Sequence, residues 1–594
     1  MRSASFWRKG WRKNETELAY FRRITRYPKA EAEAAHLKAS DESYSLPSQS
    51  GGTLQEQAER DLAVSSETVL DPSSIQAAEA LPHVQEPVTA EKGTHGQILK
   101  SSALVGGSSV VNIAVGIVRT KAMAILLGPA GYGLFGLYGS IANLAQALAG
   151  MGVNSSGVRQ IAAAVGSGDS AQIALTTVVL RRTSIVLGAL GALLLVLFSR
   201  QVSTVTFGNN QQAAAVCLLS VAVFLQLVSW GQNALIQGMR RIADLAKMQV
   251  LGAIFGTIFS VTLVYFWRDK GVVPSLVSVA MMSLAVSWWY SRKIHIQTSS
   301  VTIPQVAREA SELLKLGVVF AATGFMTMGV AYAVRIMLLR RVGFEATGYY
   351  QSAWTLGGLY VGFILQAMAA DFYPRLTASA HDNPVCNRLV NEQTQVGFLL
   401  AGPGVLGTLT FTPIVIGLFY SAKFLAAVGV LRWICLGTTL QVITWPMGFI
   451  IVAKGKQAWF FATELSWALA SLGFAWVCVK YLGLNGAGIA FFGSYIFLGL
   501  LLYPIVNRLS GFRWSTANKR MGLFFLSLIA AVFCGFYVLP FLWAACLGTV
   551  ATLLSGVYSI RVLVTLISWD QIPSPVRRLL LSFGYTPSGS VRSI

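Results

Sequence analysis

Residues 112–128 read NIAVGIVRTKAMAILLG and form most of an apolar run that extends over about 102–127. About 20 consecutive apolar residues are enough for a helix to cross the hydrocarbon core of a bilayer. Two cations, Arg119 and Lys121, interrupt this run. Because each would cost roughly 2.5–3.5 kcal/mol at the centre of a bilayer, a membrane helix that keeps them must use them or bring them to the membrane surface.

The rest of the chain has the same apolar character. Of its 594 residues, 54% are hydrophobic and 12% are charged, and the mean hydropathy is +0.58. These values exclude an ordinary soluble domain and predict an all-α polytopic membrane protein with about 14 transmembrane helices. We expect these helices at about 102–127, 132–152, 177–199, 211–231, 246–267, 272–291, 313–339, 348–370, 395–420, 426–452, 458–481, 485–506, 521–539 and 542–566.

The chain is strongly basic, with a net charge of +21. Most Lys and Arg residues lie in short loops between the expected spans, as the positive-inside rule describes, so we expect no nucleic-acid partner. If the amino terminus is cytoplasmic, the loops on that side hold about 18 Lys and Arg residues and the opposite loops about seven. This imbalance predicts that both termini lie in the cytoplasm.

Residues 1–95 differ from the rest in composition. They are poor in Val, Ile and Phe and rich in Ala, Glu, Ser and Gln, so they cannot bury a core, and we expect a disordered cytoplasmic tail. The first residues combine cations with aromatic side chains, which suits contact with an anionic leaflet. Two alternatives stay open: the tail is dispensable, or it results from an upstream start codon.

Two segments 215 residues apart share a pattern. LLGPAGYGLFG begins at Leu126 and RRVGFEATGYYQ at Arg340, and each contains the spacing Gly-x4-Gly. Each copy holds six expected spans, so both copies have the same orientation and would form two parallel, pseudo-symmetric lobes with a substrate path between them. We expect the tail over 1–95, an N-lobe over 96–300, a C-lobe over 301–510, and two extra helices with a cytoplasmic tail over 511–594.

Helical periodicity separates the two cations of the opening stretch. Two residues apart, they lie about 200° apart around a helix. Arg119 shares a stripe of small and polar residues with Asn112, whereas Lys121 shares an apolar stripe and is expected to reach the outer interface. In the second copy, Arg335 ends a similar polar stripe within one residue of the position that corresponds to Arg119.

Two such arginines would face each other across a central cavity, and ionisable residues inside a membrane often have a function. A guanidinium suits a phosphate group because it donates two hydrogen bonds at once. The alternative is that both arginines only extend toward the outer interface. The predicted substrate-binding residues are Arg119, Arg335, Asn112 and, although its own stripe is apolar, Lys121.

Three other polar residues within expected spans are candidates for the cavity or for ion coupling. Glu464 could carry a coupling proton or pair with a cation, and Gln146 and Gln351 could line the cavity. Each could instead form a hydrogen bond between helices. The sequence contains no P-loop, HExxH, GxSxG or clustered His/Cys motif, so we expect no catalytic site, no metal and no cofactor beyond coupling to H+ or Na+.

The segment SSALVGGSSVVNIAVGIVRTKAMAILLGPAGYGLFG and the later loop AGMGVNSSGVRQIAAAVGSGD resemble the opening of Wzx-type O-antigen flippases. These proteins form part of the polysaccharide transporter family of the MOP flippase superfamily. The resemblance covers roughly residues 97–510. The long amino-terminal tail and the extra pair of helices after residue 520 depart from it, and that extra pair resembles the lipid II flippases of the same superfamily.

The resemblance implies a transporter and not an enzyme. Its expected substrate is an undecaprenyl-diphosphate-linked oligosaccharide, an O-antigen or exopolysaccharide repeat unit, moved across the bacterial inner membrane by alternating access. Membrane lipids are expected partners, and so is the polysaccharide polymerase or chain-length machinery of lipopolysaccharide biosynthesis.

Three other classes stay open. The first is a lipid II-type flippase or a MATE-like antiporter of the same fold, although an antiporter for cations would call for acidic residues in the cavity. The second is a membrane polysaccharide polymerase or ligase, which usually needs a large outer loop. The third is a receptor or scaffold, for which the sequence shows no docking module.

Overall fold

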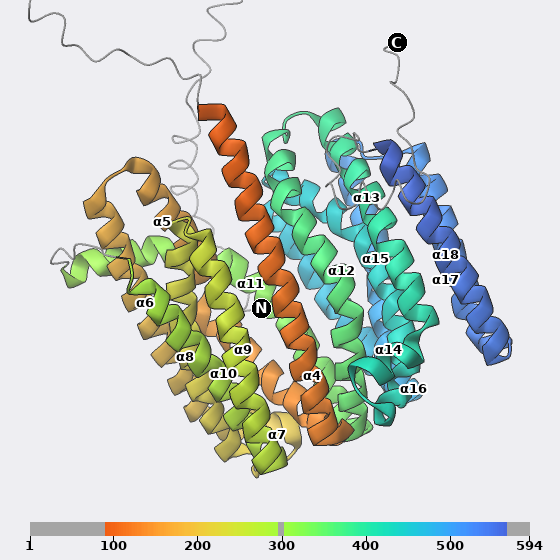
Figure 1. Cartoon of the computed structure of the whole chain (residues 1–594), viewed down its shortest axis with the longest axis horizontal. Helices are drawn as coiled ribbons and strands as arrows, with labels where there is room; N and C mark the ends of the chain where they lie inside the picture. Colours follow the sequence, from red (N-terminus) through yellow and green to blue (C-terminus); the bar gives the residue numbers. More distant parts are fainter. Residues whose placement is uncertain (1–89, 295–301, 567–594) are drawn as a thin grey trace, which may run out of the picture. The chain divides into compact units, whose positions relative to one another are not determined.

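The computed structural model of the protein describes residues 90–294 and 302–566, and every element in these ranges is helical. Residues 1–89 of the tail predicted for 1–95 lie outside the described residues. The first described helix begins at Ala90, within the last part of that predicted range. The cytoplasmic tail expected after the last helix also lies outside them. The described helices confirm the all-α class, and the labels of Figure 1 are used below.

The helices up to residue 291 form the N-terminal helix group. Within it α8 packs against α6 and α10, and α9 packs against α10 and α4 (Figure 1). The group consists of α4 (Ala90–Gly150), α5 (Val153–Ser167), α6 (Ser170–Leu197), α7 (Ser199–Phe207), α8 (Ala213–Gly238), α9 (Ile242–Trp267) and α10 (Val272–Ser291).

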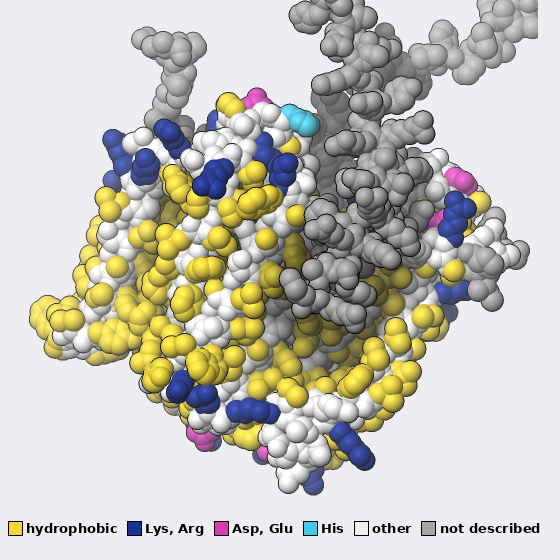
Figure 2. All heavy atoms as spheres, turned by 180° about the vertical axis from the view of Figure 1, so that it is seen from behind, with side chains coloured by type: hydrophobic (Ala, Val, Ile, Leu, Met, Phe, Trp, Pro, Cys, Tyr) yellow, Lys and Arg dark blue, Asp and Glu magenta, His cyan; other side chains and the backbone are white. Residues whose placement is uncertain are grey.

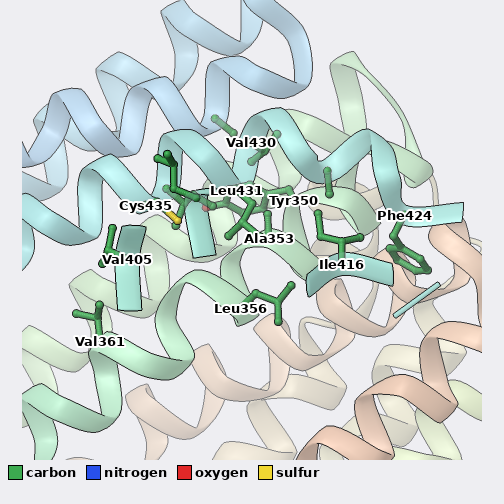
Figure 3. Packing of buried hydrophobic residues seen from close by; sticks show 14 of the residues in the cluster. Tyr350, Ala353, Leu356, Val361, Val405, Ile416, Phe424, Val430, Leu431 and Cys435 are labelled. Atoms are coloured by element: carbon green, nitrogen blue, oxygen red, sulfur yellow. The ribbon is translucent and has the colours of Figure 1, made fainter. Parts of the chain in front are cut away.

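The next six helices form the C-terminal helix group. The group consists of α11 (Ile303–Arg341), α12 (Phe344–Ala378), α13 (Asn383–Thr410), α14 (Thr412–Phe419), α15 (Val428–Ala453) and α16 (Gln457–Ser510). Figure 3 shows part of its core, where Leu356 of α12, Val405 of α13 and Leu431 of α15 are buried together. The remaining helices, α17 (Thr516–Val538) and α18 (Phe541–Leu566), pack against α13. The division into lobes with pseudo-symmetry stays a prediction.

Within the described ranges, nine helices are long and apolar enough to cross a membrane, or ten if α13 and α14, bent by 85°, count as one span. Three of these stretches are 44, 50 and 54 residues long, more than twice what one crossing needs, and each is interrupted near its middle. The helix α12 is not among these nine. The total of fourteen crossings therefore stays a prediction.

The break in α4 follows directly from its sequence. Gly128 has φ 66° and ψ −176°, a conformation that side chains disfavour, and Pro129 follows it. The expected spans 102–127 and 132–152 lie on either side of this break. A second glycine, Gly483 with φ 57°, breaks α16 in the same way.

The outer surface of the described part has the polarity of a membrane protein. Figure 2 shows hydrophobic side chains over the middle of one face and Lys and Arg gathered toward its two ends. Many large apolar side chains on it are more than half exposed, among them Phe266, Leu469 and Leu500. A water-soluble protein does not expose so much contiguous apolar surface, so the chain is a multi-pass membrane protein.

Candidate functional site

Arg335 lies on α11 inside the molecule and is only 5% exposed. Its Nε donates a hydrogen bond of 2.8 Å to Oε1 of Gln351 on α12, and its Nη1 donates one of 2.6 Å to the carbonyl of Ala331. The guanidinium carbon is also 5.7 Å from the centre of the Tyr350 ring. Two of the predicted residues, Arg335 and Gln351, are thus direct partners, and the structure places this arginine among protein groups.

Tyr132 connects Arg335 with Arg119. This tyrosine follows the break of α4, is 2% exposed, and interacts electrostatically with both arginines. Its hydroxyl is 3.4 Å from that of Tyr420, which lies just after α14. We call Arg119, Arg335, Gln351, Tyr132 and Tyr420 the arginine cluster. Its residues come from both helix groups.

The sequence did not point to the two tyrosines of the cluster. Tyr132 stands between the two glycines of the first repeat copy, where only the glycines served as landmarks. The corresponding residue of the second copy is Thr347, so comparison of the copies gave no signal. Tyr420 follows an apolar helix end and has no sequence pattern of its own.

The periodicity predicts different surroundings for Arg119 and Lys121. Both side chains are half-buried, however, so their burial does not distinguish them. Arg119 interacts electrostatically with Tyr132. Asn112, two turns before Arg119, is half-buried, and its Oδ1 atom has no hydrogen-bond partner among the described groups. Gln146 is buried in the second half of α4, about 20 Å along the helix from Tyr132, and therefore lies apart from the arginine cluster.

The two glycine-containing repeats pack directly against each other. A Cβ atom on Gly348 would lie 1.9 Å from the carbonyl oxygen of Pro129, and one on Gly133 would lie 2.4 Å from that of Phe344. Corresponding glycines of the two copies therefore allow α4 and α12 to touch through their backbones. The cluster lies beside this contact, since a Cβ on Gly136 would meet Oε1 of Gln351 at 2.8 Å.

Further polar contacts join the two helix groups near α7. The guanidinium of Arg340, at the end of α11, donates to the carbonyls of Thr204 (2.6 Å) and Val205 in the last turn of α7. The hydroxyls of Tyr332 and Thr206 are also hydrogen bonded. We call the end of the molecule that holds these contacts the α7 end. There the two groups are held together.

Glu464 lines a separate cavity within the C-terminal helix group. The cavity has a volume of about 280 Å³ and lies between α11, α15 and α16, with Gln441, Thr327 and Tyr495 also in its wall. A smaller cavity of about 40 Å³ shares Thr327 and Trp467 with it and reaches Ala331 and Tyr350, both partners of Arg335. Together the two cavities extend from Glu464 to two residues that contact Arg335.

Comparison with known proteins identifies the relatives of this chain. The family model described as "Polysaccharide biosynthesis protein" matches residues 122–429. The lipid III flippase of Escherichia coli (strain K12) is 25% identical over 410 residues, which cover 67% of this chain and 95% of the relative.

Solved structures share the fold. One described as lipid II flippase MurJ in an inward closed conformation has a TM-score of 0.60 at 14% identity and covers 78% of this chain and 99% of its own. A MATE transporter of the MOP superfamily in an inward-facing conformation has a TM-score of 0.56 at 16% identity, over 67% of this chain and 98% of its own. The chain therefore shares its fold with these lipid II flippase and MATE structures. Because the family model spans more than half of the sequence, the chain belongs to the polysaccharide biosynthesis protein family.

Proposed function

We propose that this protein is a flippase that moves a glycan linked to a lipid diphosphate across the bacterial inner membrane. The observation that carries the proposal is Arg335, a cation held inside the molecule where the two helix groups meet. Membership of the polysaccharide biosynthesis family and similarity to a lipid III flippase support the class of substrate. We infer undecaprenyl as the lipid and an O-antigen or exopolysaccharide repeat unit as the glycan.

The chemistry of the arginine cluster suits a diphosphate. Moving its negative charges through hydrocarbon without partners is prohibitively unfavourable, and a guanidinium can donate to two phosphate oxygens at once. Gln351 and the Ala331 carbonyl now accept the hydrogen bonds of Arg335. Phosphate oxygens would replace these neutral acceptors, and their negative charge would add direct attraction to the guanidinium.

Alternating access would open and close the two helix groups around the cluster. The contacts of the α7 end, including Arg340 with α7, close the path on that side. We infer that this side is periplasmic and that both termini are cytoplasmic, because the loops at the opposite end carry the excess of Lys and Arg. Transport would then require these contacts to break once in each cycle.

Glu464 is the proposed coupling residue. Its cavity has room for several water molecules, and the 40 Å³ cavity beside it has room for one. Two buried donors that line the smaller cavity, Trp467 Nε1 and Ser471 Oγ, have no protein partner among the described residues. Waters there would satisfy them and would connect Glu464 with the surroundings of Arg335. A proton is the simplest coupling ion for a single carboxylate, and Na+ is the alternative.

The test is transbilayer movement of a fluorescent undecaprenyl-diphosphate sugar in proteoliposomes. We expect wild-type protein to move it faster than empty liposomes do, and a matched undecaprenyl glycoside that lacks the diphosphate to stay in its leaflet. Equal movement of both lipids would refute the role of the diphosphate. No movement of either lipid, with pH and Na+ gradients imposed in both directions, would refute the flippase.

A further inference from the structure

A cationic cavity lies far from the arginine cluster. It has a volume of about 420 Å³ and is lined by residues of α6, α8 and α10 of the N-terminal helix group and by Arg292 and Ile294, which follow α10. Arg181, in its wall, is roughly 27 Å along α6 from the start of α7. The proposed transport path makes no use of this cavity.

Two arginines from different helices line the cavity. Arg181 comes from α6, and Arg292 immediately follows α10. The Arg292 guanidinium lies over the Trp288 ring, 4.9 Å from its centre, and Trp288 also lines the cavity. None of the described residues in the wall carries a carboxylate. The cavity therefore has a net positive charge that an anion would neutralise.

A buried amide adds a neutral hydrogen-bonding group. Gln232 is 9% exposed and lines the cavity from α8. Its Oε1 accepts a hydrogen bond of 2.7 Å from Ser287, which fixes the orientation of the amide. The NH2 group of the amide is then the end that is left to donate to a ligand.

The polarity of the wall changes with depth. Arg181, Ser291 and Arg292 lie toward the end of the helix group where α10 ends. The wall is apolar one helical turn deeper. Ile185 lies one turn deeper than Arg181 on α6, and Val228 lies one turn deeper than Gln232 on α8. Ile185 is 47% exposed on the apolar surface. The apolar part of the wall would not contribute to binding of a free anion. A phospholipid matches both parts, because it has a phosphate at one level and acyl chains just below it.

We propose that this cavity binds an anionic phospholipid. The phosphate ester would accept hydrogen bonds from Arg181, Arg292 and Gln232, and the first acyl carbons would contact Ile185 and Val228. Each cation near a membrane surface contributes about 1 kcal/mol to attraction of anionic lipid, and a cavity concentrates that attraction at one place. This site is independent of the transported substrate.

The chain supplies its own matched control. Arg182 and Lys293 are the immediate neighbours of Arg181 and Arg292, are equally charged, and do not line the cavity. Native mass spectrometry of delipidated protein titrated with phosphatidylglycerol would compare R181Q/R292Q with R182Q/K293Q. We expect the first pair to weaken the tightest lipid-binding step roughly 10- to 30-fold and the second pair to change it less than about twofold.

Two results would overturn the site. If R181Q/R292Q and R182Q/K293Q weaken lipid binding equally, binding depends on the overall charge of this surface and not on the cavity. If soluble glycerol phosphate occupies the protein as tightly as phosphatidylglycerol and displaces it, the cavity binds phosphate and not lipid. Size-exclusion chromatography and Tm verify that the variants are folded. Because no transport is measured, either result leaves the proposed flippase function untouched.

Discussion

Arg335 keeps a positive charge inside the molecule through two hydrogen bonds to neutral acceptors and the face of a tyrosine ring. Neutral partners hold the charge without cancelling it, so it remains available to an anionic ligand. A carboxylate in the place of Gln351 would neutralise it and compete with the substrate. This difference separates a binding arginine from a structural ion pair.

Replacement of Arg335 by Gln should therefore slow diphosphate-dependent transport strongly. We expect the rate to fall at least about tenfold, since a charge-assisted hydrogen bond contributes about 1.5–3 kcal/mol. Proteoliposome transport measures this, with Lys121→Gln as the control for a half-buried cation outside the cluster. A near-wild-type rate for Arg335→Gln would mean that Arg335 does not contact the substrate.

Replacement of Glu464 by Gln should uncouple transport from the ion gradient. The amide has nearly the shape of the carboxyl group but does not titrate, so it cannot take up and release a coupling proton. We expect the rate measured with a pH gradient to fall to the rate measured without one. Glu345, an exposed carboxylate of α12 that does not line the cavity, is the control position. Retained gradient dependence in Glu464→Gln would exclude Glu464 as the coupling residue.

At the scale of helices, the contact between α4 and α12 depends on glycine. Gly348→Ala should lower the Tm, because its Cβ would overlap the carbonyl of Pro129 and push the helices apart at a cost of about 1–3 kcal/mol. Gly358→Ala on the same helix meets nothing within 4 Å and should raise stability slightly, by about 0.5–1 kcal/mol. Thermal unfolding in detergent compares the two, and equal Tm values would show that the contact does not hold the helices together.

The helices themselves were predictable from the sequence because each expected span depends on a local run of apolar residues. The repeat showed that Gly133 and Gly348 correspond, but not that their helices touch, since that contact depends on how segments 215 residues apart pack. For the same reason, Arg335 and Gln351 could be named as candidates from local pattern. The tyrosines of the cluster could not, because only tertiary packing brings Tyr420 to Tyr132.

At the scale of the whole molecule, Arg340 links the two helix groups at the α7 end. Loss of its hydrogen bonds should shift the protein toward conformations that are open there. Spin labels at Gln201 of α7 and Phe344 of α12, both exposed, report the distance between the groups once the native cysteines are replaced. We expect Arg340→Gln to add longer distances to the distribution.

Arg341 provides the control for this experiment. It is the next residue, carries the same charge, and lies over the Trp476 ring within the C-terminal helix group. Arg341→Gln should leave the distance distribution unchanged. If both variants change it alike, or if neither does, the contact of Arg340 with α7 does not set the conformational balance.

The pairing of Tyr132 with Tyr420 has a consequence for biosynthesis. The two residues are 288 positions apart, and ribosomes add roughly 5–20 residues per second. The helix that carries Arg119 and Tyr132 therefore waits about 15–60 s in the membrane before the last member of its cluster is made. During that interval the nascent chain holds an unmatched polar surface, which is the feature by which membrane quality control would recognise a truncated chain.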